Sequence, residues 1–241
     1  MREYYCNHTS SRIFHTLVET NVLTYNPPTM SILRSFRRIM VLAPHTDDAE
    51  IGCGGTIAKL LEAKIEIFWV VFSKASTTKP FSAKSVLKEL KKSAEVLGIH
   101  PQNLIVYDYQ VRHLPEVRQS ILQNLVDLKR KIDPDLILMP TLTDIHQDHS
   151  TVAQEGLRAF KHISILGYED PWNHITFNSS SFIHLERQHI LKKINALKMY
   201  KSQAKRAYMD EEFIESLART RGVQIGSSFA EAFEVIRWII H

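Results

Sequence analysis

Two segments of the chain concentrate histidine and aspartate, the side chains that bind metal ions and move protons. The first, 44–50, reads Pro-His-Thr-Asp-Asp-Ala-Glu, and the second, 140–149, reads Pro-Thr-Leu-Thr-Asp-Ile-His-Gln-Asp-His. Each follows a short apolar run and precedes a helical pattern, which is typical of the carboxyl end of a buried strand. Ligands of open α/β sheets bind at such ends, where the strand order reverses. We therefore expect the two segments to meet at one site.

Three of these side chains have the composition of a hydrolytic metal site: His45, Asp48 and His149. Two imidazoles and one carboxylate leave a fourth coordination position for water, as in catalytic zinc sites. Bound zinc lowers the pKa of that water towards ~7. The same triad also suits non-haem Fe²⁺. The residues therefore predict a metal site, with Zn²⁺ as the expected ion and Fe²⁺ as the alternative.

Three neighbouring residues would supply acid–base chemistry. Asp47 cannot easily share the metal face of Asp48, so it is free to act as the general base. His146 is close enough in sequence to His149 to face a substrate oxygen, where an imidazolium would stabilise an oxyanion or protonate a leaving amine. Asp148 would hold a neighbouring imidazole in one tautomer. The alternative for either segment alone is a surface turn or helix cap, where aspartate is also favoured.

A glycine-rich turn, Gly52-Cys53-Gly54-Gly55, opens the first expected helix. Its position resembles that of a phosphate-cradling loop, but it lacks the G-x-G-x-x-G spacing, and no Lys-Ser/Thr follows it. We interpret it as a tight turn that allows close packing, with Cys53 as a small buried residue rather than a metal ligand. A nucleotide- or sugar-binding protein without hydrolytic activity is the alternative that rests on this turn.

Strand and helix patterns alternate from Arg38 onward. Short apolar runs predict buried strands at 39–43, 65–72, 104–107 and 136–139, and helical patterns lie near 55–64, 84–98, 114–132 and 148–160. Further strands are expected at 163–166, 182–185 and 233–236, and further helices at 186–203 and 210–219. This alternation predicts an α/β protein with a doubly wound, mostly parallel sheet and helices on both faces.

Composition excludes several classes of protein. The 241 residues are 44% hydrophobic and 23% charged, an ordinary globular mixture. Two cysteines, Cys6 and Cys53, are too few for a disulfide scaffold and suit a reducing compartment. The formal net charge is only +4, and the basic residues are scattered or paired with acids, so nucleic-acid binding is not expected.

The N-terminal part of the chain shows no targeting pattern. The sequence contains no run of about 18 apolar residues, so no transmembrane segment is expected. Residues 1–29 lack the apolar region of a signal peptide. They end in the breaker cluster Asn-Pro-Pro-Thr at 26–29. We interpret 1–29 as a loosely attached N-terminal extension and expect a cytoplasmic protein.

The two His/Asp segments and the turn between them resemble the PIG-L/LmbE-like zinc-dependent deacetylases. The family patterns A/P-H-x-D-D, G-x-G-G-T and H-x-D-H match 44–48, 52–56 and 146–149, and 218–222 and 230–233 are also similar. The resemblance covers about 38–240, which implies one deacetylase domain at 30–241. It further implies a Rossmann-like fold and removal of acetyl groups from N-acetylglucosamine-type sugars, as small molecules or linked to a lipid or nucleotide.

Carried over by position, the resemblance implies His45, Asp48 and His149 as zinc ligands, Asp47 as base and His146 as oxyanion stabiliser. Two positions depart from the family pattern. Ala49 replaces an acid that often follows the aspartate pair, with Glu50 one place later. Val86 stands where many members carry a substrate-reaching arginine, three residues before Glu89. Sugar recognition is therefore expected to differ.

Substrate contacts are expected from two further segments. Trp172 and Asn173 combine an apolar ring with a hydrogen-bonding amide, a sugar platform whose alternative is a packed turn. Arg112 follows the third expected strand and would contact a phosphate or hydroxyl group. Tyr200 and Tyr208, like Met199, are expected to pack rather than bind.

The sequence as a whole predicts a zinc-dependent hydrolase that removes an acetyl group from an N-acetylated amino sugar, in a glycan or surface-polysaccharide pathway. Two alternatives remain open: the non-catalytic binding protein, and a metal-dependent amidase that acts on a non-sugar amide. The sequence does not specify the oligomeric state.

Overall fold

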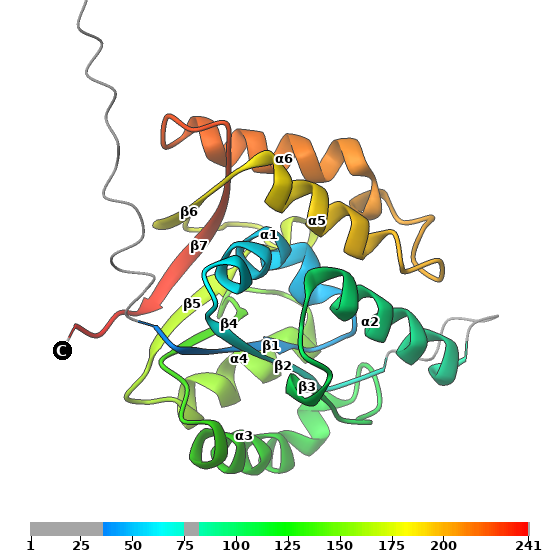
Figure 1. Ribbon diagram of the computed structural model, residues 1–241. Helices are drawn as coiled ribbons and strands as arrows, with labels where there is room; N and C mark the ends of the chain where they lie inside the picture. The colour runs from blue at the N-terminus through cyan, green and yellow to red at the C-terminus, as the bar shows by residue number, and fades with distance from the viewer. Residues whose placement is uncertain (1–35, 75–81, 241) are drawn as a thin grey trace, which may run out of the picture. The chain divides into compact units, whose positions relative to one another are not determined.

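The computed structural model describes residues 36–74 and 82–240, and the expected extension at 1–29 lies outside the described residues. The described residues form a seven-stranded sheet in the order β3-β2-β1-β4-β5-β7-β6 (Figure 1). Its strands are β1 (Arg38–Ala43), β2 (Glu66–Val71), β3 (Leu104–Val106), β4 (Leu136–Pro140), β5 (Ser164–Tyr168), β6 (Ser181–Leu185) and β7 (Phe229–Arg237). The first five pair in parallel, and β7 pairs antiparallel with both β5 and β6. The order reverses between β1 and β4, which confirms the doubly wound sheet.

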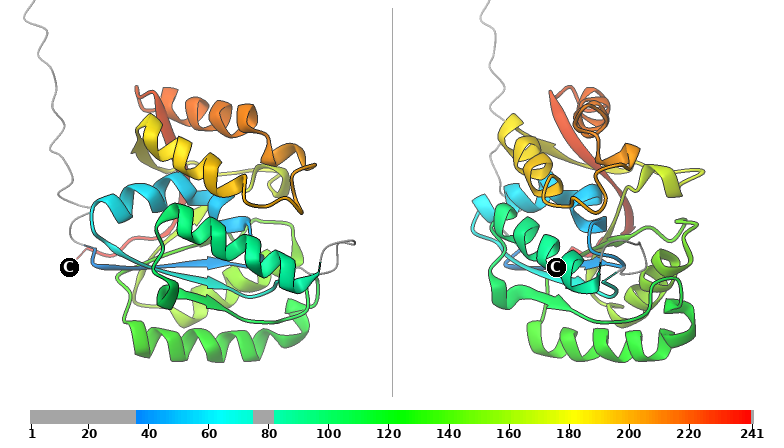
Figure 2. Two further views of the ribbon diagram at one scale, coloured as in Figure 1. Left: turned by 45° about the vertical axis from the view of Figure 1, so that its right-hand side comes forward. Right: turned by 90° about the vertical axis from the view of Figure 1, so that its right-hand side faces the viewer.

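Helices cover both faces of this sheet (Figure 2). They are α1 (Asp48–Glu62), α2 (Ala83–Leu97), α3 (Arg118–Ile132), α4 (Gln147–Ala159), α5 (Arg187–Leu197) and α6 (Glu211–Val223), with short 3₁₀ turns η2 (Pro101–Asn103), η3 (Leu114–Val117), η4 (Pro171–Asn173) and η5 (Ala207–Met209). Strand side chains alternate between two cores. Ile39 and Val41 of β1 belong to the core with α1, α2, α5 and α6, whereas Met40 and Leu42 belong to the core with α3 and α4.

The expected strands and helices are found, with differences at three places. Helix α1 begins at Asp48, earlier than expected, and is kinked at Cys53, whose backbone has φ −149° and ψ 25°. Helix α5 ends at Leu197 rather than near 203. Tyr200 follows that end, and its buried hydroxyl donates to the carbonyl oxygen of Thr46 at 2.5 Å. Strand β7 is longer than expected and lies between β5 and β6.

The glycine-rich turn is the kink in α1. A Cβ at Gly55 would lie 2.6 Å from Leu185 Cδ1, so glycine allows α1 to pack closely against β6 without displacing that side chain. The amides after the kink start a second helical segment, and the Glu231 carboxylate of β7 accepts from Gly55 N at 3.0 Å and Thr56 N at 2.7 Å. Lys193 donates to Glu231 at 2.7 Å. The anion bound by this turn is therefore a side chain of the protein itself, which removes the reason for inferring a nucleotide-binding loop.

Candidate active site and metal centre

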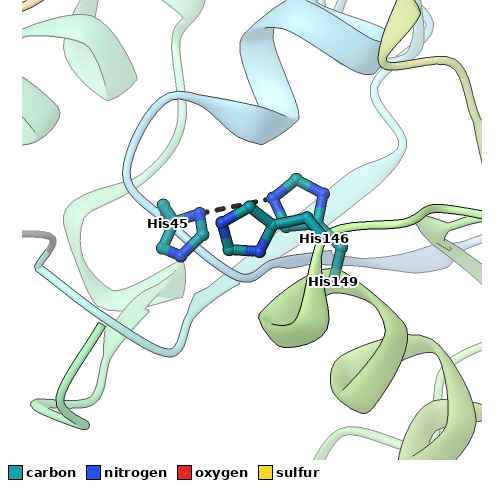
Figure 3. Close-up of side chains that lie close together, drawn as sticks. All are labelled: His45, His146 and His149. Atoms are coloured by element: carbon teal, nitrogen blue, oxygen red, sulfur yellow. Dashed lines mark hydrogen bonds between the residues drawn. The ribbon is translucent and has the colours of Figure 1, made fainter. Parts of the chain in front are cut away.

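The carboxyl ends of β1 and β4, which are neighbours in the sheet, bring His45, Asp48 and His149 together. Figure 3 shows the two histidines of this triad beside His146. His45 lies in the loop after β1, Asp48 is the first residue of α1, and His149 lies in the first turn of α4. His45 Nδ1 is 3.2 Å from Asp48 Oδ2 and 3.3 Å from His149 Nε2. His149 Nε2 is also 3.3 Å from Asp48 Oδ2. Three potential ligand atoms thus form a nearly equilateral triangle.

The size of this triangle can be compared with a zinc site. In a tetrahedral site with metal–ligand bonds of about 2.0 Å, neighbouring ligand atoms lie about 3.3 Å apart. The three separations here match that value, and the three residues are 2–7% exposed. His146 and Asp170 also offer ligand atoms close by, within the groups His45–His146–His149 and Asp48–His149–Asp170. The donor set and its spacing therefore fit a single divalent ion.

Buried carboxylates orient both imidazoles. His45 Nε2 bonds Asp148 Oδ2 at 2.9 Å, which leaves Nδ1 free to bind a metal. His149 Nδ1 bonds Asp144 Oδ2 at 2.7 Å and lies 3.3 Å from Asp170 Oδ2, which leaves Nε2 free. Such carboxylate–histidine pairs fix the ring and raise its basicity as a ligand. Sequence reasoning identified Asp148 but missed Asp144, although it lies in the same segment, and Asp170, which comes from the end of β5.

The buried carboxylates around His45 and His149 shift the pKa values of the triad. Burial disfavours a charged His45, but Asp48 and Asp148 outweigh it and raise the pKa of His45 to about 9. For His149, burial is likewise outweighed by Asp48 and the orienting carboxylates, which hold its pKa well above the usual value. Burial would raise the pKa of Asp48, yet the two histidines lower it well below normal. Without a metal, protons on His45 and His149 therefore balance the charge of the carboxylates, as a bound cation would.

Asp47 lies next to the triad but has different surroundings. It occupies the N-cap position of α1, yet its side chain makes no capping hydrogen bond. Instead it lines the cavity in front of the triad. Burial, together with the charge of Asp48, raises the pKa of Asp47 to about 6. A carboxylate that is ionised at neutral pH and has a pKa near it is well matched to taking a proton from water.

His146 is the N-cap residue of α4, and its Nδ1 accepts a hydrogen bond from Asp148 N at 3.2 Å. A neutral His146 ring consequently carries its proton on Nε2. Burial and the neighbouring His149 and His45 lower the pKa of His146, which favours the neutral ring over the imidazolium that the sequence suggested. His146 can therefore donate a hydrogen bond from Nε2.

The expected substrate residues Arg112, Trp172 and Asn173 all line the same cavity of about 310 Å³. Three residues that sequence reasoning did not assign to the substrate line it as well: Gln203, Arg206 and Tyr208. Tyr208, which was expected to pack, stacks on Trp172 with ring centroids 4.0 Å apart. These residues follow α5 in irregular structure, where no periodic pattern marks them. Val86, by contrast, is buried in the core and offers no charge to the cavity.

Comparison with known proteins decides the family. A family model described as GlcNAc-PI de-N-acetylase (PIG-L) matches residues 40–160, which contain both His/Asp segments. This chain belongs to the PIG-L family. The class of enzyme expected from the sequence, a deacetylase that hydrolyses an amide bond, is confirmed by this match and by deacetylase relatives.

Two relatives of this PIG-L family member are named as deacetylases. The first is an uncharacterized deacetylase, YaiS, of Escherichia coli K12, 30% identical over 173 residues, which cover 68% of this chain and 90% of YaiS. The second is a diacetylchitobiose deacetylase of Thermococcus kodakarensis, 28% identical over 154 residues. That match covers 61% of this chain and 54% of the Thermococcus protein, so it spans about half of the longer relative.

A solved structure shows the same fold. The N,N'-diacetylchitobiose deacetylase of Pyrococcus horikoshii, complexed with an inhibitor, superposes with a TM-score of 0.69 at 21% identity, over 85% of each chain. Within residues 36–74 and 82–240 of this PIG-L family chain, no helix has the length and hydropathy that a membrane span needs.

Proposed function

We propose that this PIG-L family member is a zinc-dependent enzyme that removes the acetyl group from an N-acetylated amino sugar. One observation carries the proposal: His45 Nδ1, Asp48 Oδ2 and His149 Nε2 lie 3.2–3.3 Å from one another at the base of a cavity. Relatives named as deacetylases, one of them a diacetylchitobiose deacetylase, support the reaction and the class of sugar.

The metal would be held by His45, Asp48 and His149. When bound, zinc supplies Lewis acidity, which polarises the acetyl carbonyl and makes a water molecule easier to deprotonate. Two imidazole nitrogens and one carboxylate oxygen are also the donor set of Fe²⁺ sites, so the metal content of the purified protein distinguishes the two ions.

The protein's own residues move the protons. Asp47 orients the attacking water and takes its proton, which its raised pKa of about 6 allows at neutral pH. Attack on the amide carbon places negative charge on the former carbonyl oxygen, and His146 Nε2–H donates a hydrogen bond to it. Asp47 then returns the proton to the leaving nitrogen as the C–N bond breaks. The products are acetate and a free amine.

The walls of the cavity would position the sugar. The exposed edge of the Trp172–Tyr208 stack offers an apolar surface, and Asn173 adds amide groups at the same wall. All the residues with proposed roles lie within 30–241, which we propose acts as one catalytic domain, and we place the reaction in the cytoplasm. A non-sugar amide is the competing substrate.

The test is acetate release by the zinc-loaded protein from N-acetylglucosamine, diacetylchitobiose and a non-sugar acetamide such as Nε-acetyl-lysine. We expect release from the sugars, and loss of both bound metal and activity in His149→Asn. The matched control is His184→Asn, an exposed histidine of β6. Release from acetyl-lysine alone would overturn the sugar assignment, and iron rather than zinc in protein purified without added metal would overturn the choice of ion.

A further inference from the structure

Two arginines line the active-site cavity without an acidic partner. Arg112 comes from the segment after β3 and Arg206 from the turn before η5. Within 36–74 and 82–240, neither of them lies within 4.0 Å of a carboxylate, whereas six arginines do: Arg38, Arg118, Arg130, Arg158, Arg187 and Arg221. Three further described arginines, Arg37, Arg219 and Arg237, also form no ion pair, but they do not line the cavity. Arg112 and Arg206 are thus the unpaired arginines that lie where a ligand would bind.

The backbone of Arg112 is fixed relative to the metal centre. Arg112 has a φ of 69°, a left-handed conformation that side chains rarely adopt. Its N–H donates at 2.6 Å to Asp148 Oδ2, the same oxygen that bonds His45. The strained conformation is therefore maintained by the carboxylate that orients a metal ligand, and it holds the Arg112 side chain at the cavity.

Arg206 is held by contacts that leave part of its guanidinium free. Its Nε donates to Gln203 Oε1 at 2.8 Å, and its Cζ lies 5.7 Å from the ring centroid of Tyr208. Tyr208 in turn stacks on Trp172. The Gln203 bond uses Nε alone, and within the described ranges Nη1 and Nη2 form no hydrogen bond, so they remain for a ligand. Arg206 and Asp47 line the same cavity.

The chemistry of the guanidinium group indicates the ligand. Its planar fork of donors matches the oxygens of a phosphate or carboxylate, and charge-assisted bonds of this kind are about twice as strong as neutral ones. A neutral sugar needs no such charge, because amides such as Asn173 and Gln203 can form hydrogen bonds with its hydroxyl groups equally well. Two arginines at one cavity therefore favour a substrate with an anionic group.

We propose that Arg112 and Arg206 form an anion subsite, and that the substrate is an N-acetyl amino sugar bearing a phosphate or carboxylate close to the acetamido ring. This inference rests on the proposed function and specifies its substrate class. The anion would bind at the mouth of the cavity while the acetamide reaches Asp47 and the metal ligands.

The kinetic test compares an anionic substrate with a neutral one. N-Acetylglucosamine 1-phosphate, N-acetylmuramic acid and methyl N-acetylglucosaminide provide a phosphate, a carboxylate and no charge. We expect at least one anionic sugar to exceed the neutral glycoside about tenfold in kcat/KM. Arg206→Gln and Arg112→Gln should each reduce that ratio several-fold, mainly through KM, and Arg206→Lys should reduce it less. The control is Arg219→Gln, an exposed arginine of α6 outside the cavity.

A binding measurement separates this inference from the proposed function. Glucosamine 1-phosphate is titrated calorimetrically into the wild type, the two Arg→Gln variants and the control. We expect binding to weaken in both Arg→Gln variants and to weaken with added salt in the wild type. If no sugar is deacetylated, the proposed function fails, and calorimetry still decides the anion subsite. Equal kcat/KM for charged and neutral sugars, or binding of glucosamine 1-phosphate unaffected by both variants, would overturn the subsite.

Discussion

Asp47 and Asp48 are adjacent in sequence, yet their surroundings give them opposite properties. Asp48 lies between two imidazoles that hold its pKa well below normal, which suits the proposed role of metal ligand. Asp47 faces the cavity, where burial and the charge of Asp48 raise its pKa to about 6, which suits the proposed role of general base. The groups around each carboxylate thus give two identical side chains different pKa values.

Replacement of Asp47 by asparagine should separate catalysis from metal binding. We expect kcat to fall about 10²–10⁴-fold because the proton acceptor is lost, while one metal ion per chain is retained because the ligand triad is unchanged. In the wild type, kcat/KM should decline as pH falls through about 6, when Asp47 becomes protonated. Acetate release across pH, with metal content measured by mass spectrometry, checks both. Near-wild-type turnover in Asp47→Asn would remove this residue from the mechanism.

Metal binding should compete with protons at the two histidines. The pKa of His45 is raised to about 9 and that of His149 is held well above its usual value, so both are charged at pH 7 without metal. Zinc must displace these protons, so its apparent affinity should fall as pH decreases below 9, by up to about tenfold per pH unit for each proton released. Titration of chelator-treated protein in buffers of different ionisation enthalpy counts the protons.

The matched variant for that experiment is Asp148→Asn. It removes the carboxylate bonded to His45 Nε2, so fewer protons should be released at pH 7 and metal affinity should fall about 10–100-fold. His184→Asn on exposed β6 serves as the control. Zinc binding that released no protons in the wild type would contradict the pKa assignment.

Residue types and spacing were sufficient to predict that His45, Asp48 and His149 lie together, because adjacent parallel strands end at the same edge of a sheet. The same reasoning could not find Asp170 or Arg206. Asp170 follows β5, where it lies in no recognisable motif, and Arg206 follows a helix that ends earlier than its periodicity indicates. Side chains on irregular segments are placed by tertiary contacts such as the Tyr200–Thr46 hydrogen bond, which local patterns do not encode.

At the scale of elements, the kink at Cys53 divides α1 into two segments. The segment before Cys53 carries Asp48, and the segment after it starts on amides bonded to Glu231. Strand β7 and helix α5 therefore support the second segment of α1 through one buried ion pair, Lys193 with Glu231. The sequence indicated a tight turn at the glycines but not its partner, because Glu231 lies far away in the chain.

Replacement of Glu231 by glutamine should destabilise the fold. It leaves the Lys193 charge buried without a counter-ion and removes an acceptor for the amides of α1. Breaking a buried pair in this way typically costs about 3–5 kcal/mol. Chemical denaturation followed by circular dichroism measures the loss, with Glu95→Gln, an exposed residue of α2, as the control. The double variant with Lys193→Met should recover part of the loss, and equal stability of Glu231→Gln and the wild type would contradict the role of the pair.

At the scale of the whole molecule, the parallel part of the sheet followed from the alternation of apolar runs and helical patterns. The antiparallel part did not, because nothing in the runs at 164–168, 181–185 and 229–237 specifies that the last strand lies between the other two. That order depends on which faces remain to be covered after the central sheet has formed. It also brings β7 beside α1, since Glu231 accepts hydrogen bonds from Gly55 and Thr56.

One buried acid connects the stability of the whole fold to pH. Glu50 of α1 is fully buried, accepts a short hydrogen bond from Ser93 of α2, and lies 2.7 Å from the hydroxyl of Tyr200 after α5. Its second oxygen has no hydrogen-bond partner among the described residues. Burial raises the pKa of Glu50 to about 8, despite the opposing hydrogen bonds. The folded protein therefore retains a proton that the unfolded chain releases near pH 4.5.

The fold should become less stable as the pH rises, because Glu50 stays protonated in the folded protein at pH values where it is ionised in the unfolded chain. Its stabilising contribution is fully present below pH 4.5 and is lost as pH rises to about 8, a change of several kcal/mol at about 1.4 kcal/mol per unit of pKa shift. Glu50→Gln keeps the shape and the acceptor oxygen but cannot ionise, so it should gain stability relative to the wild type as pH rises from 4.5 to about 8. Denaturation of both proteins in chelator, so that metal binding does not contribute, measures the difference. Parallel stability curves would show that Glu50 ionises in the folded state as readily as in water, and that α1, α2 and the segment after α5 do not exclude solvent from it.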